Sequence, residues 1–178
     1  MYCGKKVRLR AYRKEDAECA WSYINDEEIR RYLVPGIPFP ITLVEEEKWI
    51  ESQSSSVDTY NFAIETLDGG KYIGGCGINN LDWKNSIATV GIFLGKDYLS
   101  KGYGTDAMST LVGFVFNQMN INKVKLHVYA FNERAIKSYK KCGFKLEGTL
   151  RQEIFRDGRY HDEYVMGILK EEYENLKF

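Results

Sequence analysis

The stretch of the chain best suited to bind an anion lies between a predicted strand and a predicted helix, at residues 94–105. Gly102 and Gly104 let the backbone approach a ligand closely, and the N–H groups and dipole of a helix start favour negative charge. Lys101 adds a positive charge, so a phosphate or pyrophosphate is the expected guest. The stretch lacks the ending of a Walker A loop and the third glycine of a dinucleotide fingerprint. A glycine-containing turn without a ligand is the alternative interpretation, since Gly-x-Gly alone has low specificity.

A second informative stretch runs from Asn132 to Phe144. Asn132 stands where a predicted strand gives way to a helix, and Tyr139 follows two helical turns later on the same face. Taken singly, these residues have ordinary structural roles: Asn132 as a helix N-cap, Tyr139 as a core tyrosine and Gly143 as a C-cap. Their combination, rather than any one of them, is what suggests a binding function.

The rest of the pattern predicts the elements that position these stretches. Strands are predicted at 7–12, 60–67, 71–81, 86–94, 123–129, 144–155 and 160–169, and helices at 16–24, 27–33, 42–53, 103–119, 133–142 and the C-terminus. Asp16 is the expected cap of the first helix, and Thr42 to Glu45 form a capping box. Asp157-Gly158 is a hairpin signal, whereas the prolines at 35–40 and the serines at 54–56 indicate loops. A meander followed by alternating strands and helices favours an α/β or α+β fold with a mixed sheet.

Composition limits the class of protein. The chain has 178 residues, 44% hydrophobic and 28% charged, which predicts one globular domain spanning residues 1–178. Lys plus Arg equals Asp plus Glu at 25 each, so nothing indicates a nucleic-acid binder. The four scattered cysteines and two strand histidines predict no metal site. With no signal peptide and no long apolar run, we expect a cytoplasmic protein without membrane attachment.

Together the two stretches resemble the GNAT N-acetyltransferase superfamily. Its phosphate motif, Gln/Arg-x-x-Gly-x-Gly/Ala, falls on 99–104, and Asn-x-x-Ala-x-x-x-Tyr-x-x-x-Gly-Phe is matched in full from Asn132 to Phe144. Segments 147–151 and 155–162 are similar to the branch that holds ribosomal-protein N-terminal acetyltransferases and spermidine acetyltransferases. The resemblance covers about residues 6 to 170. It implies a mixed, mostly antiparallel twisted sheet of about seven strands flanked by about four helices, with a splayed strand pair holding the cofactor.

The resemblance also implies an activity, in which an amine attacks acetyl-CoA directly in a ternary complex. A strand backbone would pair with the pantetheine arm, a loop would hold the pyrophosphate, and an N–H near Leu94 would polarise the thioester carbonyl. Tyr139 would protonate or hydrogen-bond the leaving thiolate. The residues assigned to acetyl-CoA are Ile92, Phe93, Leu94, Leu99, Ser100, Lys101, Gly102, Tyr103, Gly104, Thr105 and Asn132.

Two residues depart from the family pattern. Leu99 replaces a Gln or Arg, which leaves phosphate binding by backbone N–H groups intact. Thr89 stands where many relatives carry a Glu that acts as general base, and a threonine cannot take up a proton at neutral pH. Glu65 or Glu153 acting through water is the alternative base. An N-terminal amine has a pKa of ~8 rather than the ~10 of an alkyl amine, so it depends less on a general base to remove its proton.

The expected substrate is therefore a protein N-terminal α-amine, of the ribosomal-protein type. A polyamine, an aminoglycoside and a non-catalytic CoA sensor are the alternatives. Substrate selection is expected in the last hairpin and in the N-terminal helices, where Asp26, Glu27, Glu28 and residues 45–47 form an acidic run. This run either attracts a polyamine or is a solvated helix face. A homodimer is a further expectation from the resemblance.

Overall fold

The computed structural model describes residues 1–33, 36–53 and 60–176, so the predicted loops at Pro35 and 54–56 lie outside the described part. The chain forms two compact units, which are described separately. Unit 1 comprises 1–77 and 92–110, and unit 2 comprises 78–91 and 111–178. The strands form a sheet of eight in the order β1-β2-β3-β4-β5-β6-β8-β7 among the described residues.

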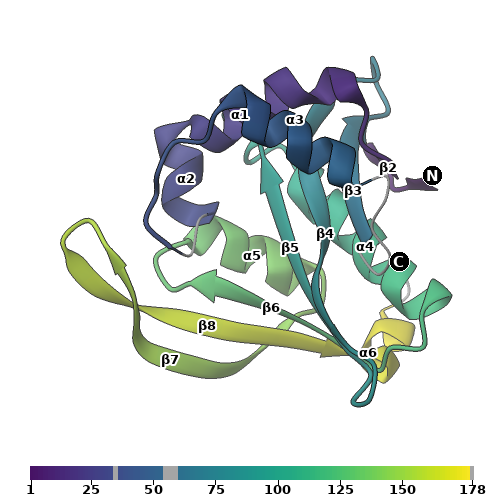
Figure 1. Ribbon diagram of the computed structural model, residues 1–178. Coiled ribbons are helices and arrows are strands. Elements are labelled where there is room, and N and C mark those ends of the chain that lie inside the picture. Colours follow the sequence, from purple (N-terminus) through teal and green to yellow (C-terminus); the bar gives the residue numbers. More distant parts are fainter. Residues whose placement is uncertain (34–35, 54–59, 177–178) are drawn as a thin grey trace. The chain divides into compact units, whose positions relative to one another are not determined.

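Unit 1 carries the N-terminal strands and helices (Figure 1). Its elements are β1 (Tyr2–Cys3), β2 (Val7–Arg10), the 3-10 turn η1 (Lys14–Asp16), α1 (Ala17–Asn25), α2 (Glu27–Leu33), α3 (Leu43–Ser52), β3 (Tyr60–Thr66) and the 3-10 turn η2 (Lys96–Tyr98). It also holds parts of β4 (Tyr72–Asp82), β5 (Ile87–Leu94) and α4 (Tyr103–Gln118), which continue into unit 2.

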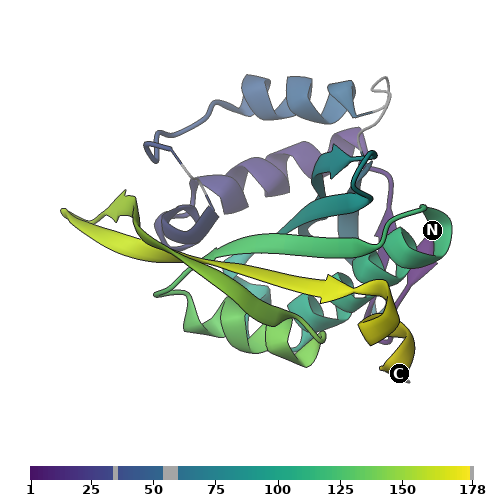
Figure 2. The ribbon, with the colours of Figure 1, turned by 90° about the horizontal axis from the view of Figure 1, so that it is seen from below.

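The core of unit 1 lies under helices α1 and α3, which pack side by side (Figures 1 and 2). Ala17 and Ala20 of α1 and Ile50 of α3 are buried together with Ala63 of β3 and Tyr72 of β4. Because alanine side chains are small, α1 can approach the strands closely. This packing fixes which face of α3 is turned inward.

A buried ion-pair network replaces the expected cap at Asp16. The Arg10 guanidinium donates to both Asp16 carboxylate oxygens, at 2.7 and 2.8 Å, and also binds Glu65 of β3. Asp16 makes no side-chain cap bond to α1, although its carboxylate accepts from the backbone N–H of Arg13 at 2.8 Å. The capping prediction for Asp16 is wrong because a buried arginine competes for the carboxylate and binds it at two points.

Unit 2 is built on a long hairpin and two further helices. Its elements, besides the shared ones, are β6 (Lys123–Tyr129), α5 (Glu133–Lys141), β7 (Lys145–Arg156), β8 (Arg159–Leu169) and α6 (Lys170–Asn175). The β7–β8 turn has left-handed Asp157 (φ 52°) and Gly158 (φ 76°), which confirms the predicted hairpin turn. Strand β6 pairs antiparallel with β8 and parallel with β5.

The parallel ladder between β5 and β6 is short. It joins Ile87, Ala88 and Thr89 to residues 123–125 and stops there, so Val90 is no longer paired with Leu126. A strand pair that separates in this way agrees with the splayed pair that the resemblance implied.

The predicted elements and the mixed, mostly antiparallel sheet are confirmed, with two differences in number. The described residues contain eight strands rather than about seven, because β1 adds two residues beside β2. They contain the six α-helices that the sequence pattern predicts, whereas the resemblance implied about four; the additional ones include the seven-residue α2 and the six-residue α6. Within the described part, no helix is long and apolar enough to cross a membrane.

Candidate active site

The loop before α4 has the alternating backbone handedness that is typical of anion-binding loops. Ser100 (φ 59°) and Gly102 (φ 86°) are both in the left-handed region, with Lys101 between them. Alternating backbone handedness turns successive N–H groups toward one point, which makes an anion-binding nest. The loop leads directly into the 16-residue helix α4, whose first N–H groups have no carbonyl partner within the helix. Loop and helix start therefore suit a phosphate group.

Lys6 adds a second positive charge to this loop, and sequence reasoning missed it. Its Nζ donates to the carbonyl oxygen of Lys101 at 2.9 Å and lies 5.8 Å from the centroid of the Tyr103 ring. The Asp106 carboxylate holds this segment in place, accepting from the backbone N–H groups of Lys5, Lys6 and Val7 at 2.9, 2.8 and 3.0 Å. The nest is thus flanked by two lysines, so the residues present fit a pyrophosphate.

The end of β5 lies close against β4 because β4 has a glycine, Gly74, at the point of contact. A Cβ on Gly74 would come within 2.2 Å of the carbonyl oxygen of Phe93 and 2.9 Å of the Cα of Leu94. The ring of Tyr23, from α1, covers the following residue, since a Cβ on Gly95 would lie 2.7 Å from the Tyr23 Cε1. These contacts fix the backbone of the strand to which the pantetheine arm is assigned.

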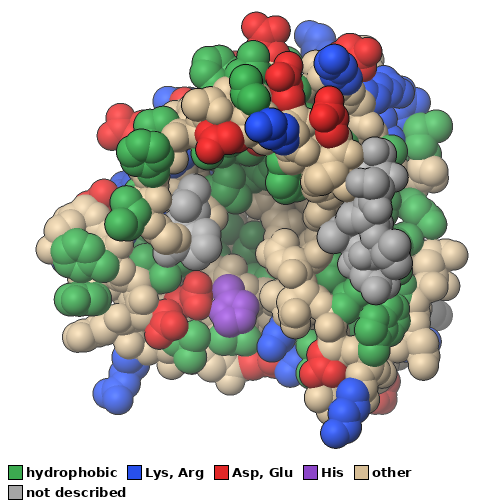
Figure 3. All heavy atoms as spheres, in the orientation of Figure 1, with side chains coloured by type: hydrophobic (Ala, Val, Ile, Leu, Met, Phe, Trp, Pro, Cys, Tyr) green, Lys and Arg blue, Asp and Glu red, His purple; other side chains and the backbone are tan. Residues whose placement is uncertain are grey.

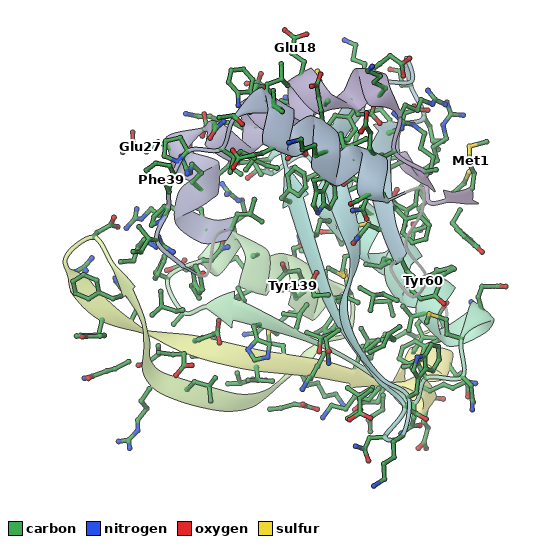
Figure 4. All side chains as sticks on the ribbon, in the orientation of Figure 1. Met1, Glu18, Glu27, Phe39, Tyr60 and Tyr139 are labelled. Carbon is green, nitrogen blue, oxygen red and sulfur yellow. The ribbon has the colours of Figure 1, made fainter. Side chains whose placement is uncertain are left out.

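In unit 2, Asn132 is the N-cap of α5 and Tyr139 lies on that helix, as predicted. The Asn132 Oδ1 accepts from the backbone N–H of Ala135 at 3.2 Å, which confirms the N-cap and leaves the side-chain amide to donate elsewhere. Tyr139 is buried, with 9% of its surface exposed, and Figure 4 labels it on this helix. Burial raises the pKa of the Tyr139 hydroxyl, so it stays protonated at neutral pH and can serve as a hydrogen-bond donor.

Of the two alternative general bases, Glu65 is bound by arginines and Glu153 is exposed to solvent. Burial alone would raise the pKa of Glu65, but hydrogen bonds from Arg10 and Arg8 outweigh it and lower that pKa. A carboxylate held by guanidinium groups is a poor proton acceptor, so Glu65 is structural. Glu153 lies exposed on β7, and Thr89 is half-buried on β5.

The acidic residues of the N-terminal helices do not form one free anionic surface. Asp26 accepts from the backbone N–H of Glu28 at 3.0 Å, and Glu28 pairs with Lys96 at 3.2 Å. Glu45 completes the capping box with Thr42. Side chains of both charges cover the helices of unit 1 in Figure 3, and Glu18 and Glu27 point outward in Figure 4. Most of the acidic run therefore has a structural role or is a solvated helix face.

Comparison with known proteins gives the family. The model of the acetyltransferase (GNAT) domain matches residues 6–145. The chain is 30% identical over 173 residues to the uncharacterized N-acetyltransferase p20 of Bacillus licheniformis, covering 95% of this chain and 96% of that protein. The chain is also 30% identical to the spermidine N(1)-acetyltransferase of Escherichia coli strain K12, covering 97% of this chain and 91% of that protein. The putative ribosomal N-acetyltransferase YdaF of Bacillus subtilis is 28% identical, covering 73% and 81%.

The fold comparison agrees. The structure of spermidine N-acetyltransferase from Vibrio cholerae in complex with CoA and spermine superposes with a TM-score of 0.85 at 26% identity, covering 95% of this chain and 98% of that one. The chain therefore belongs to the GNAT acetyltransferase family. It is an N-acetyltransferase, and its acetyl donor is acetyl-CoA.

Proposed function

We propose that this enzyme holds acetyl-CoA by the loop before α4 and transfers its acetyl group to a primary amine of a polyamine-type molecule. The observation that carries the first part is the nest formed by Ser100 and Gly102 at the start of α4, with Lys6 and Lys101 beside it. Backbone N–H groups from Ser100 to Thr105 bind the pyrophosphate, and the two ammonium groups neutralise its charge.

The remaining assigned residues act on the other parts of the donor. The backbone of Ile92, Phe93 and Leu94 pairs with the pantetheine arm as an added strand, and Asn132 donates to that arm. Acetyl-CoA supplies a thioester whose carbonyl carbon accepts the amine nitrogen. An N–H near Leu94 polarises that carbonyl.

Tyr139 donates a hydrogen bond to the departing sulfur rather than giving up its proton outright. An alkyl thiol has a pKa of ~8.5, whereas burial raises the pKa of Tyr139 above the usual value of a phenol. The thiolate is therefore the weaker base of the two. A neutral donor beside the sulfur stabilises the negative charge that forms there.

Two amine classes have support. A polyamine-type substrate is supported by the similarity to spermidine N(1)-acetyltransferase, which extends over 97% of this chain. A protein N-terminal amine, the substrate expected from the sequence, is supported by the likeness to YdaF and by Thr89. Threonine cannot act as a base, and an α-amine with a pKa of ~8 loses its proton more readily than an alkyl amine. We propose the polyamine first because the similarity to the spermidine enzyme covers more of this chain than the similarity to YdaF.

Two further proposals concern the whole chain. We propose that residues 1–178 act as one acetyltransferase domain, because β4, β5 and α4 each contribute to both units. The four cysteines are free thiols, which supports a reducing compartment such as the cytoplasm. The homodimer stays a prediction for a mass measurement in solution.

The proposed function is tested by the release of free CoA thiol from acetyl-CoA. The amines are spermidine, an aminoglycoside, and short peptides that begin with Ala, Ser or Met. We expect rapid release with spermidine and slow release with the peptides. Turnover on the peptides alone would establish the N-terminal amine instead, and CoA binding without turnover on any amine would contradict the proposal.

A further inference from the structure

Glu46 is a buried carboxyl group, and one of its oxygens lacks a hydrogen-bond partner in the part of the chain that the structure describes. It lies on α3 with 3% of its surface exposed, and its Oε1 has no hydrogen-bond partner among the described residues. Burying a carboxyl oxygen without a hydrogen bond costs free energy, so such an atom needs an explanation. The neighbouring Glu45 and Glu47 are not buried, which sets Glu46 apart within the acidic run.

The surroundings of Glu46 are aromatic hydroxyls and apolar side chains. Burial, and to a smaller extent the charge of Glu46, raises the pKa of the hydroxyls of Tyr12, after β2, and Tyr72, on β4. The other ionisable groups near these tyrosines include Cys76 of β4, Tyr23 of α1, whose ring stacks on Tyr72 at 6.0 Å, and Asp16 of η1, which is already bound to Arg10. On the same side, α1 turns alanines inward. No cation among these groups neutralises Glu46.

Tyr12 connects this acid to the strand assigned to acetyl-CoA. A Cβ on Gly75 would lie 2.0 Å from the Tyr12 Oη and 2.8 Å from the Phe93 Cε1. The Tyr12 hydroxyl therefore rests directly on Gly75 and beside the ring of Phe93. Trp49 of α3 packs edge-on against Tyr12 at a centroid distance of 5.1 Å and holds the ring in this position.

We propose that Glu46 is the final acceptor of the proton that the attacking amine must lose, acting through the hydroxyl of Tyr12 and intervening water. The inference rests on the proposed function. An ammonium substrate loses two protons as it becomes an amide. One proton passes to Glu46 and from there to solvent, and the other ends on the released CoA thiol. The C–N bond forms as the C–S bond breaks, and the sulfur leaves with the electron pair.

This assignment resolves the problem posed by Thr89. Threonine cannot accept the proton, and Glu65 is held by arginines. Burial raises the pKa of Glu46 to about 7, close to the value at which a base works best in neutral solution. An alkyl amine with a pKa near ~10 is mostly protonated at that pH and so requires such a base.

The test compares Glu46→Gln with Glu47→Gln, a matched control one residue away on the same helix. The readouts are kcat, the KM for acetyl-CoA, and the pH profile of kcat/KM. The amine is spermidine, or whichever of the amines named above the wild-type enzyme acetylates. We expect Glu46→Gln to lower kcat ~10²-fold at neutral pH with the KM for acetyl-CoA unchanged. It should also remove the acidic limb of the pH profile, which is the fall in kcat/KM below about pH 7 as Glu46 becomes protonated. Raising the pH should restore its rate, because the amine then loses its proton unaided. Glu47→Gln should behave as the wild type.

Tyr12→Phe is the second variant, because it deletes only the hydroxyl and keeps the ring that packs on Trp49. We expect a lower kcat with the acidic limb retained, since Glu46 is still present. A folded Glu46→Gln enzyme with wild-type kcat and an unchanged pH profile would overturn the inference. A wild-type enzyme that transfers acetyl to no amine would instead contradict the proposed function, so the two failures are distinguishable.

Discussion

The raised pKa of Glu46 makes the stability of this protein depend on pH in a way that one substitution should remove. The ordinary pKa of 4.5 rises to about 7 in the folded state because burial disfavours the charged carboxylate. Between these values the folded state binds more protons than the unfolded state, so the free energy of unfolding falls as pH rises. At about 1.4 kcal/mol for each pKa unit, the full effect is roughly 3 kcal/mol.

The assay is urea unfolding of the wild type, Glu46→Gln and Glu47→Gln at about pH 5 and about pH 8. Since glutamine does not ionise, Glu46→Gln should gain up to roughly 3 kcal/mol relative to the wild type between the two pH values. Glu47→Gln should follow the wild type, because that side chain is not buried. If Glu46→Gln and the wild type show the same pH dependence, Glu46 does not have a raised pKa and the physical reasoning is wrong.

Three further perturbations test other parts of the structure. Asp16→Ala removes one of the two carboxylates that bind the buried Arg10 guanidinium, so we expect the free energy of unfolding in urea to fall by about 3 kcal/mol. Tyr139→Phe should lower kcat ~10²-fold with little change in the KM for acetyl-CoA, and undiminished turnover would remove the hydroxyl from the mechanism. Lys6→Gln should raise the KM for acetyl-CoA about tenfold, whereas Lys5→Gln, which keeps its backbone bond to Asp106, should not.

The elements that local chemistry determines could be predicted from the sequence. The strand at 123–129 alternates apolar and polar residues, and the Asp157-Gly158 turn and the Asn132 cap each depend on neighbours in the chain. The turn at 99–104 could be predicted in the same way, because left-handed backbone favours glycine and Gly102 adopts it. Asp16 shows the limit of this reasoning, since a carboxylate before a helix is normally a cap and only the fold reveals Arg10 beside it.

The residues that the sequence did not reveal owe their roles to distant partners. Lys6 meets the carbonyl of Lys101 across 95 residues, so no local pattern marks it. Glu46 stands in an acidic run that resembles a solvated face, yet it lies four residues before the buried Ile50 and therefore on the same helix stripe. That spacing was the one available signal, and charge alone argued against it.

The most direct test of the proposed reaction is a competition experiment with products identified by mass spectrometry. The enzyme is given acetyl-CoA with equal concentrations of spermidine and a peptide that begins with Ala. Our account predicts that acetylated spermidine accumulates first and that CoA thiol is released in equal amount. Acetylated peptide with unmodified spermidine would contradict the polyamine assignment, and hydrolysis of acetyl-CoA with neither amine modified would contradict the amine transfer itself.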